Sequence, residues 1–233
     1  REKGYHYRDI AVICSDMGTY ADHLERVCTE YQIPVFMDYK KSILLNAFVE
    51  YVRSVLSMVE QDFSYESVFR FLRTGFTEFT RDEIDRLENY VVAVGLRGYK
   101  KWQAVWARKT SSADEEELAV LNGLRVRFVE MTESLVFVLK QRKKTVRDIC
   151  EAVYRFFVEN QIQEKLKVME NCFAEKKELA LAKEYAQIYR IVLELFDKFA
   201  ELLGDEGISL KEYCELLDAG LEEAKVGVIP PGM

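Results

Sequence analysis

Prolines are almost absent from the interior of this chain. They stand only at positions 34, 230 and 231, so no proline interrupts a helix between Pro34 and Pro230. Because proline removes a backbone N–H and clashes with the turn before it, its absence over so long a stretch favours long helices. With 233 residues, of which 49% are hydrophobic and 31% charged, the chain can bury a core in one or two domains. Fibrous and disordered classes are thereby excluded.

The charge balance and the apolar runs bear on nucleic-acid binding and on membrane insertion. Thirty-three basic residues against 40 acidic residues give a formal charge of −7, so any contact with nucleic acid must come from a local patch. No apolar run is long enough to span a bilayer, and the chain does not open on a charged and then apolar leader. The first residue is Arg1 rather than Met, so we expect a piece of a longer protein.

Five cysteines stand far apart in the sequence. An odd number without paired spacing is not typical of a disulfide framework or of a zinc site. We therefore expect free thiols in a reducing compartment and predict a soluble, cytoplasmic protein. The cysteines are Cys14, Cys28, Cys150, Cys172 and Cys214.

The first forty residues differ in pattern from the rest. Residues 9–14 form a short apolar run with β-branched side chains, which is typical of a buried strand. A helical pattern follows over 20–32, and residues 33–37 give a second strand candidate, so this region reads as one β-α-β unit. The link 15–19 between strand and helix has one glycine and no phosphate-binding motif, so we expect no nucleotide site there.

From Ser42 onward the hydrophobic period is that of a helix. Apolar residues at this spacing predict helices over about 43–59, 65–72, 114–140 and 174–203. Capping boxes, in which a hydroxyl and an acid three residues later satisfy opposing N–H groups, predict helix starts after Thr80 and Ser209, the first helix running through Val94, and a weaker form of the motif predicts one after Thr145. The tail 226–231 is apolar and β-like again. We predict a mainly α fold, a multi-helix insertion carried on a small β-α-β piece, with the two strand-like ends close together.

Signatures of catalysis are sparse. The two histidines, His6 and His23, have no metal-ligand partner at helical spacing, which gives little support to a metalloenzyme or a Ser-His-Asp hydrolase. The acids fall mostly on solvated helix faces, three or four residues from a base. We therefore predict no catalytic residue, no metal site and no cofactor site within this chain.

One stretch reverses the acidic character of the chain. No acid occurs from Asn89 to Ala113, whereas five basic residues alternate there with aromatic ones. Basic side chains that bind phosphates beside aromatic faces that stack on bases are the elements of a single-strand or junction contact. The alternative is that Trp102 and Trp106 are core anchors of a loop and that the basic side chains are merely solvated. The predicted DNA-binding residues are Arg97, Tyr99, Lys100, Lys101, Trp102, Arg108 and Lys109.

A second acid-free run, residues 140–147, adds five basic residues at a predicted helix junction. Such a run fits the same kind of interface. It equally fits the end of a helix, where the macrodipole favours cations.

Several motifs taken together resemble one bacterial protein family. The chain opens with Tyr7-Arg-Asp-Ile-Ala-Val-Ile13 and closes with Val226-Gly-Val-Ile-Pro-Pro231. Between them lie Phe69-Arg-Phe-Leu-Arg-Thr-Gly75, Glu83-Ile-Asp-Arg-Leu-Glu-Asn-Tyr90 and Gly95-Leu-Arg-Gly-Tyr-Lys-Lys-Trp102, whereas about 111–203 is similar only in helicity. The combination resembles the C-terminal helicase-like region of the AddB/RexB family, the B subunits of bacterial AddAB-type ATP-dependent helicase/deoxyribonucleases.

The resemblance extends to UvrD-like helicases and implies how the chain is divided. It makes residues 1–41 the β-α-β portion of the second RecA-like domain, 42–225 an all-α helical insertion domain and 226–233 a strand returning toward the RecA-like domain. Active UvrD-like helicases have an arginine soon after the first strand. Here Cys14 and Ser15 follow Ile13, which fits a helicase fold that has lost nucleotide use.

The resemblance also implies a role in double-strand break repair and recombination. The segment is then expected to shape the DNA path and to pack against the A subunit, with DNA and that subunit as partners and no membrane contact. The ATP, Mg and 4Fe–4S cluster of the parent family belong to regions without a counterpart in these 233 residues, so the segment itself is expected to be no nuclease. The alternative is an all-α protein-interaction module without DNA contact.

Overall fold

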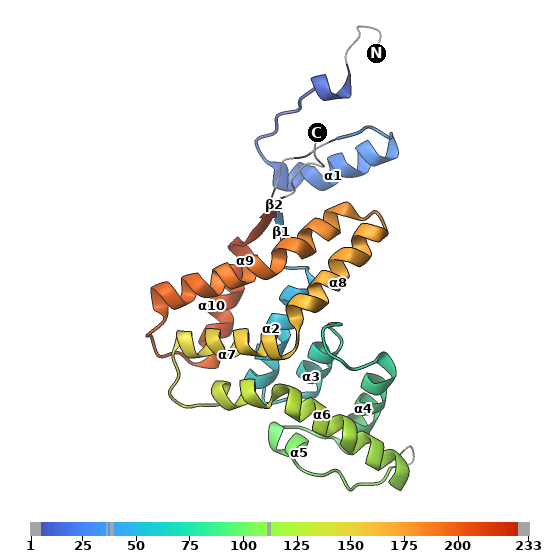
Figure 1. Cartoon of the computed structure of the whole chain (residues 1–233), viewed down its shortest axis with the longest axis vertical. Coiled ribbons are helices and arrows are strands. Elements are labelled where there is room, and N and C mark those ends of the chain that lie inside the picture. The colour runs from blue at the N-terminus through green and yellow to red at the C-terminus, as the bar shows by residue number, and fades with distance from the viewer. Residues whose placement is uncertain (1–5, 36, 38–39, 111–112, 228–233) are drawn as a thin grey trace.

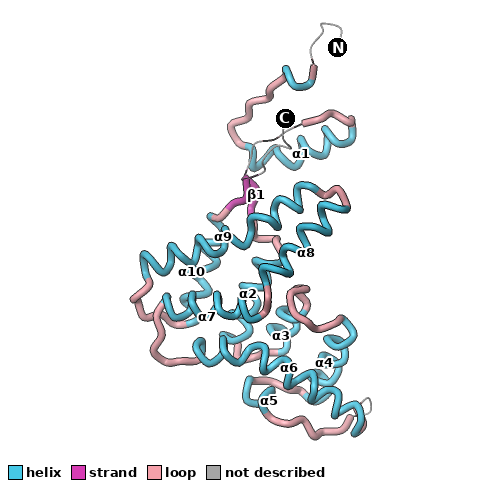
Figure 2. The backbone as a smooth tube through the Cα atoms, in the orientation of Figure 1, coloured by secondary structure: helices cyan, strands magenta, loops and turns pink. Residues whose placement is uncertain are grey.

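The chain folds into a mainly α-helical molecule (Figure 2). The computed structural model describes residues 6–35, 37, 40–110 and 113–227. None of the helices in these ranges is both long and apolar enough to cross a membrane. Besides the 3-10 helix η1 (Tyr7–Asp9), the helices are α1 (Met17–Glu30), α2 (Ala47–Glu60), α3 (Tyr65–Leu72), α4 (Arg81–Val94), α5 (Tyr99–Gln103), α6 (Glu115–Leu139), α7 (Val146–Glu159), α8 (Ile162–Glu175), α9 (Leu179–Leu203) and α10 (Leu210–Glu223).

Local sequence signals set several of the helix starts. The three predicted capping boxes are confirmed: Thr80, Thr145 and Ser209 each accept a hydrogen bond from the backbone N–H three residues later. In return, the acid at that later position accepts from the N–H of the cap, at 2.7, 2.8 and 2.9 Å respectively. α4, α7 and α10 therefore begin one residue after their caps, as the capping box requires.

Residues 174–203, predicted as one helix, contain the end of α8, a turn and the whole of α9. α8 ends at Glu175 and α9 begins at Leu179, with Lys177 in the left-handed conformation (φ 63°) between them. A lysine rarely adopts that conformation because its Cβ crowds the backbone. No glycine or proline marks the turn, so helical periodicity continues through it; α5 and most of α8 also lie outside the predicted helices.

Aromatic side chains form the centre of the helical core. Tyr51 of α2 is fully buried, and its ring centroid lies 5.9 Å from that of Phe156 in α7 and 5.2 Å from that of Phe71 in α3. Phe48, nearly one turn earlier in α2, meets Phe157 at 5.3 Å. α2 therefore contacts both the helices before α6 and those after it, and all of them share one core (Figure 1).

Two short strands lie side by side where the chain enters and leaves the helices. β1 (Lys40–Ser42) pairs antiparallel with β2 (Lys225–Gly227), which places Lys41 opposite Val226. Val226 is buried in the same core as the helices. We call this pair of strands the neck. Helices α2–α10, the helical block, lie on one side of the neck and α1 lies on the other (Figure 1).

The N-terminal residues 6–35, which we call the N-terminal arm, differ from their prediction. α1 forms where a helix was predicted, and Asp16 Oδ1 caps it by accepting from Thr19 N at 3.3 Å. Residues 10–14 and 33–35 are irregular rather than strands, and Ile13 is 97% exposed. A strand needs a neighbour to complete its hydrogen bonds, and the described residues supply none here. Phe36 and residues 228–233 of the predicted return strand lie outside the described ranges.

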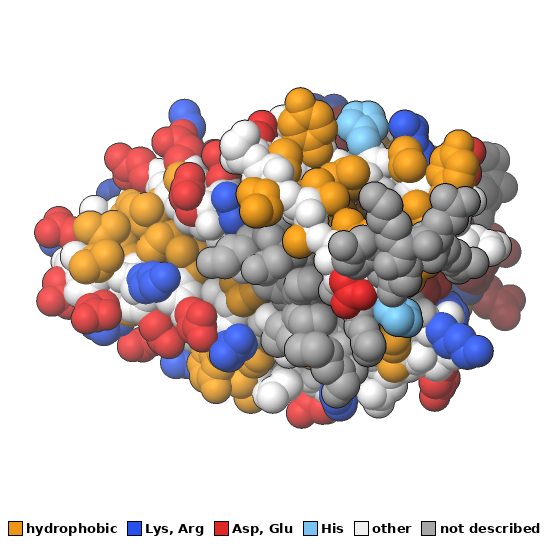
Figure 3. Space-filling view, turned by 90° about the horizontal axis from the view of Figure 1, so that it is seen from above, with side chains coloured by type: hydrophobic (Ala, Val, Ile, Leu, Met, Phe, Trp, Pro, Cys, Tyr) orange, Lys and Arg blue, Asp and Glu red, His pale blue; other side chains and the backbone are white. Residues whose placement is uncertain are grey.

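Apolar side chains gather at the surface of this end of the molecule. Figure 3 views the molecule from above and shows hydrophobic side chains gathered on this end. In the arm, Val12 is 76% and Tyr31 69% exposed. Soluble proteins rarely leave adjoining apolar side chains so exposed unless another surface covers them.

Candidate nucleic-acid interface

The predicted DNA-binding stretch lies at the end of the molecule opposite the neck (Figure 1). Gly95 ends α4 in the left-handed conformation (φ 64°), and Gly98 precedes α5 at φ 87°. Glycine adopts both conformations without a steric penalty. Between the two glycines Leu96 is buried and Arg97 is exposed. The turn therefore presents Arg97 to solvent.

The aromatic side chains of the stretch belong to the core. Trp102 is only 1% exposed; its ring centroid lies 5.1 Å from that of Trp106 and 4.6 Å from that of Phe128 in α6. Tyr99 is buried as well, with its ring 4.6 Å from that of Phe63. Protein covers both rings in this structure, so neither Tyr99 nor Trp102 offers a face to DNA bases here. The alternative, in which the tryptophans anchor a loop, describes their position.

Polar contacts that the sequence did not single out hold this loop in place. The indole N–H of Trp106 donates to the carbonyl of Lys101 at 2.9 Å, and its backbone N–H donates to Asn122 Oδ1 at 2.9 Å. Arg125, buried in α6, donates to the carbonyl of Trp102 at 2.8 Å, and burial lowers the pKa of its guanidinium. A sequence does not distinguish a buried arginine from a surface one, so the hydrophobic periodicity does not indicate that Arg125 is buried.

The basic side chains of the stretch lie on the surface. Lys109 is partly neutralised, because its Nζ lies 3.0 Å from Oε2 of Glu115. The other four form no ion pair within the described part of the chain, so their charges are available to an anion. These are Arg97, Lys100, Lys101 and Arg108.

The second basic run meets the first at α5. Nζ of Lys140, at the end of α6, lies 5.1 Å from the centroid of the Tyr99 ring and 2.5 Å from Oδ1 of Asp62. Arg142 and Lys143 follow in the exposed loop. Two acid-free runs far apart in the sequence therefore meet at Lys140 and Tyr99. We define the basic edge as the exposed residues Arg97, Lys100, Lys101, Arg142 and Lys143.

Two other basic residues of the second run form hydrogen bonds to backbone carbonyls of the fold. Nη2 of Arg147 donates to the carbonyl of Ala200 at 3.0 Å, and Nζ of Lys144 donates to that of Gln141 at 2.9 Å. The helix-end alternative thus accounts for these two residues. The basic edge itself offers exposed cations, an arrangement that suits phosphate groups and electrostatic attraction.

All five cysteines are free thiols. Cys150 is buried with its Sγ 3.3 Å from the hydroxyl of Tyr213, and burial raises the pKa of Cys214 to about 12. Thiols that stay protonated are poor metal ligands. Among the described residues, no three or more His, Cys, Asp and Glu side chains gather where they could hold a metal ion. The residues present do not fit the iron–sulfur cluster that the family resemblance assigns to the parent protein.

Curated proteins resemble this chain from end to end. A protein from Lachnoclostridium phytofermentans, named as the B subunit of an ATP-dependent helicase/deoxyribonuclease, is 42% identical over 236 residues. Proteins of the same name from Clostridium novyi and Clostridium acetobutylicum are 37% and 35% identical over 232 and 247 residues. Each match covers 100% of this chain. No family model matches the chain.

The chain spans only about a fifth of the length of these relatives, with coverage of 20 to 21%. The resemblance that its motifs indicated is nevertheless confirmed, because the similarity includes the middle of the chain as well as the motifs. Over its whole length, the chain is similar to one segment of proteins that are named as B subunits of ATP-dependent helicase/deoxyribonucleases.

Proposed function

We propose that the chain is a structural segment of the B subunit of an ATP-dependent helicase/exodeoxyribonuclease that acts in double-strand break repair and recombination. Its part is to shape the path of the DNA, while nucleotide hydrolysis and strand cleavage take place outside it. The similarity over the whole chain to proteins that carry the B-subunit name supports the proposal. The ATP, Mg²⁺ and 4Fe–4S cluster of such a complex belong to other regions of the parent or to the A subunit.

The same proposal divides the chain at the neck. Residues 1–41 belong to a RecA-like domain, 42–225 form a helical insertion, and 226–233 return toward that domain. The pairing of Lys41 with Val226 supports the division, because it places the entry and the exit of the helical block side by side. The exposure of Val12 and Ile13 supports it as well, since a RecA-like sheet completed by the parent chain would cover them.

The basic edge is the surface that we assign to DNA. It lies on a chain of net charge −7, so a non-specific attraction of the whole segment for DNA does not account for it. Its side chains are exposed and unpaired among the described residues, and the buried tryptophans behind them fix α5. The proposed interaction is therefore with phosphates through lysine and arginine, without base stacking by Tyr99 or Trp102.

The test is a double substitution, Lys100→Ala with Lys101→Ala, in the complete two-subunit complex. Removing one phosphate interaction lowers the slope of log affinity against log salt by about one unit, so we expect weaker DNA binding and a flatter salt dependence. A matched control is Lys198→Ala with Lys211→Ala, two exposed lysines of α9 and α10. If affinity and slope stay at wild-type values while the complex remains folded, the assignment of the basic edge to DNA fails.

One observation favours a second function, an all-α interaction module without DNA contact. The rings of Trp102 and Trp106 are buried, so the aromatic half of the predicted DNA motif is used by the core. In that case the exposed lysines are only solvated, and the salt dependence of DNA binding is the same with and without them.

A further inference from the structure

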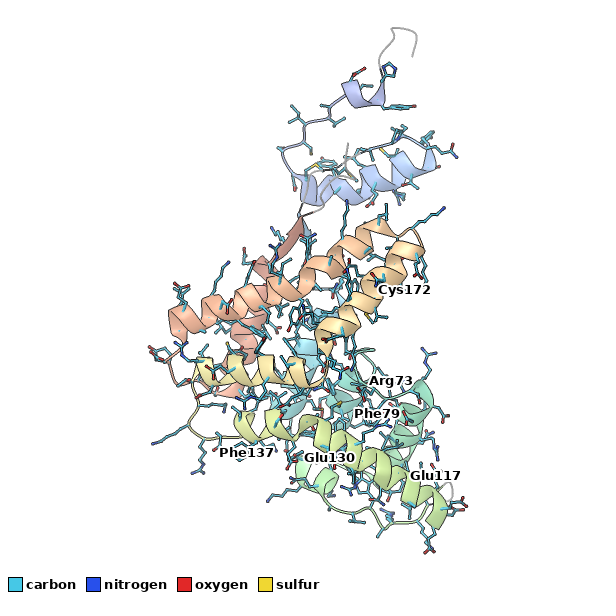
Figure 4. All side chains as sticks on the ribbon, in the orientation of Figure 1. Arg73, Phe79, Glu117, Glu130, Phe137 and Cys172 are labelled. Carbon is cyan, nitrogen blue, oxygen red and sulfur yellow. The ribbon has the colours of Figure 1, made fainter. Side chains whose placement is uncertain are left out.

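A groove of about 860 Å³ runs along α6. Its walls come from α6, the end of α7 and the loop between α3 and α4. The apolar side chains that line it are Phe79, Met131, Phe137 and Val138. Figure 4 labels Phe79, Glu130 and Phe137, which lie along this stretch of α6 and the loop beside it.

Phe137 is the unusual member of this lining. It is 69% exposed, and no other phenylalanine among the described residues is as exposed. Glu130, Ser134 and Phe137 follow one another at three or four residues, so they lie on one face of α6. A large aromatic side chain held at the edge of a groove is the usual anchor of a protein–protein contact.

The rim of the groove carries an excess of negative charge. Four acids line it, Glu78, Glu130, Glu133 and Glu159, against two arginines. One of these, Arg127, is already engaged, because its Nη2 lies 2.8 Å from Glu83 and its guanidinium covers the Phe79 ring at 4.2 Å.

We propose that this groove docks a segment of the A subunit in which lysine or arginine flanks an apolar side chain. The apolar side chain packs on Phe137, and the cations face the carboxylates of Glu130 and Glu133. This inference rests on the proposed function, since it takes the chain as part of a complex with a further subunit. Charge selects the occupant: Glu78 is paired with Lys165 at 4.0 Å, but Glu130 and Glu133 form no ion pair among the described residues, so they repel the phosphates of DNA and attract a basic polypeptide.

The first test places a photo-crosslinker in the groove of the full-length B subunit, as Phe137→p-benzoylphenylalanine. On irradiation of the purified two-subunit complex with DNA, we expect a covalent product with the A subunit, whose crosslinked peptide contains lysine or arginine beside an apolar residue. The control is Leu202→p-benzoylphenylalanine, because Leu202 is 77% exposed at the end of α9, outside the groove. A product confined to the B subunit itself, a product with DNA, or none overturns the proposal.

The second test reverses the charge of the rim with Glu130→Lys and Glu133→Lys in the full-length B subunit. We expect the dissociation constant for the purified A subunit to rise at least roughly tenfold, because opposed charges at an interface are repulsive. The exposed pair Glu201→Lys and Glu222→Lys, with the same change in net charge, should leave it unchanged. Equal effects of the two pairs in folded proteins would also overturn the proposal.

DNA affinity of the same samples separates the two hypotheses. Loss of affinity for the A subunit in the rim variant, with the salt slope still sensitive to Lys100 and Lys101, supports both. If the rim variant assembles normally, only the proposal that the groove docks the A subunit is rejected. If the salt slope of the lysine variant is unchanged, only the assignment of the basic edge to DNA is rejected.

Discussion

The helical block and the N-terminal arm bury apolar side chains to very different degrees. In the block, Tyr51 and Phe156 are completely buried and packed against other aromatic rings. In the arm, Ile13 is 97% and Val12 76% exposed, although their sequence is as apolar as that of a buried strand. A helix completes its backbone hydrogen bonds within itself, whereas a strand completes them only with a neighbour. The described residues of the block thus bury their apolar side chains against one another, whereas those of the arm leave Val12 and Ile13 exposed.

The largest expected effect comes from removing a core ring of the block. Phe156→Ala should lower the free energy of unfolding of this chain by about 3–5 kcal/mol, because it leaves a cavity beside Tyr51. Ile13→Ala should change it by less than about 0.5 kcal/mol, since Ile13 packs on almost nothing. Urea titration followed by tryptophan fluorescence measures both values. Similar losses for the two variants would remove the contrast between block and arm.

A smaller loss of stability is expected at the end of the block that contains α5, where Arg125 is the residue to replace. Arg125→Met removes the bond to the carbonyl of Trp102 and a second one, at 3.3 Å, to that of Gln103, leaving the buried carbonyl of Trp102 without this donor. We expect a loss of about 2–3 kcal/mol in the free energy of unfolding. Arg142→Met, at an exposed position, is the matched control and should be neutral. If Arg125→Met is equally neutral, the buried arginine does not fasten α5.

The smallest expected effect is on the pH dependence of stability. It concerns two acids that cap helices, one in each region. The hydrogen bond from Arg127, followed by those from Thr80, lowers the pKa of Glu83 below 4.5, and the bonds from Thr19 lower that of Asp16 below 3.8. A carboxyl with a lowered folded pKa stabilises the fold above its unfolded pKa, and this contribution is lost as the pH falls through the folded value. Glu83→Gln should therefore flatten the decline in stability below about pH 4.5.

Asp16→Asn should leave that decline unchanged when unfolding is followed by tryptophan fluorescence. Both tryptophans lie in the block, so their signal does not report a helix that melts separately in the arm. A change in the acid limb of the Asp16→Asn curve would mean that arm and block unfold together.

The elements that the sequence predicts best are those with a local cause. The boxes at Thr80, Thr145 and Ser209 each act within four residues, and all three start a helix. The turn at Lys177 has no such local signal, because nothing in the side chain favours positive φ. The strand predicted over 9–14 has the right composition, but whether it forms depends on partners that its own residues cannot supply.

The candidate site divides in the same way. The exposure of Arg97 follows from the glycines at 95 and 98, which are visible in the sequence. Whether Trp102 faces solvent or the core depends on Phe128, in a helix that begins well after it in the chain, and no local pattern reports that contact. The meeting of Lys140 with Tyr99 is likewise a product of tertiary packing.

The neck has a consequence for how such a segment changes over evolutionary time. Lys41 and Val226 are cross-strand neighbours, so their Cα atoms are separated by only about 5 Å. Residues 42–225 therefore connect two paired strands in the way that the loop of a hairpin does. Lengthening a loop adds little to the entropy of closing it. Insertions, deletions and even exchange of the whole intervening segment can therefore accumulate in the gene without rerouting the chain on either side.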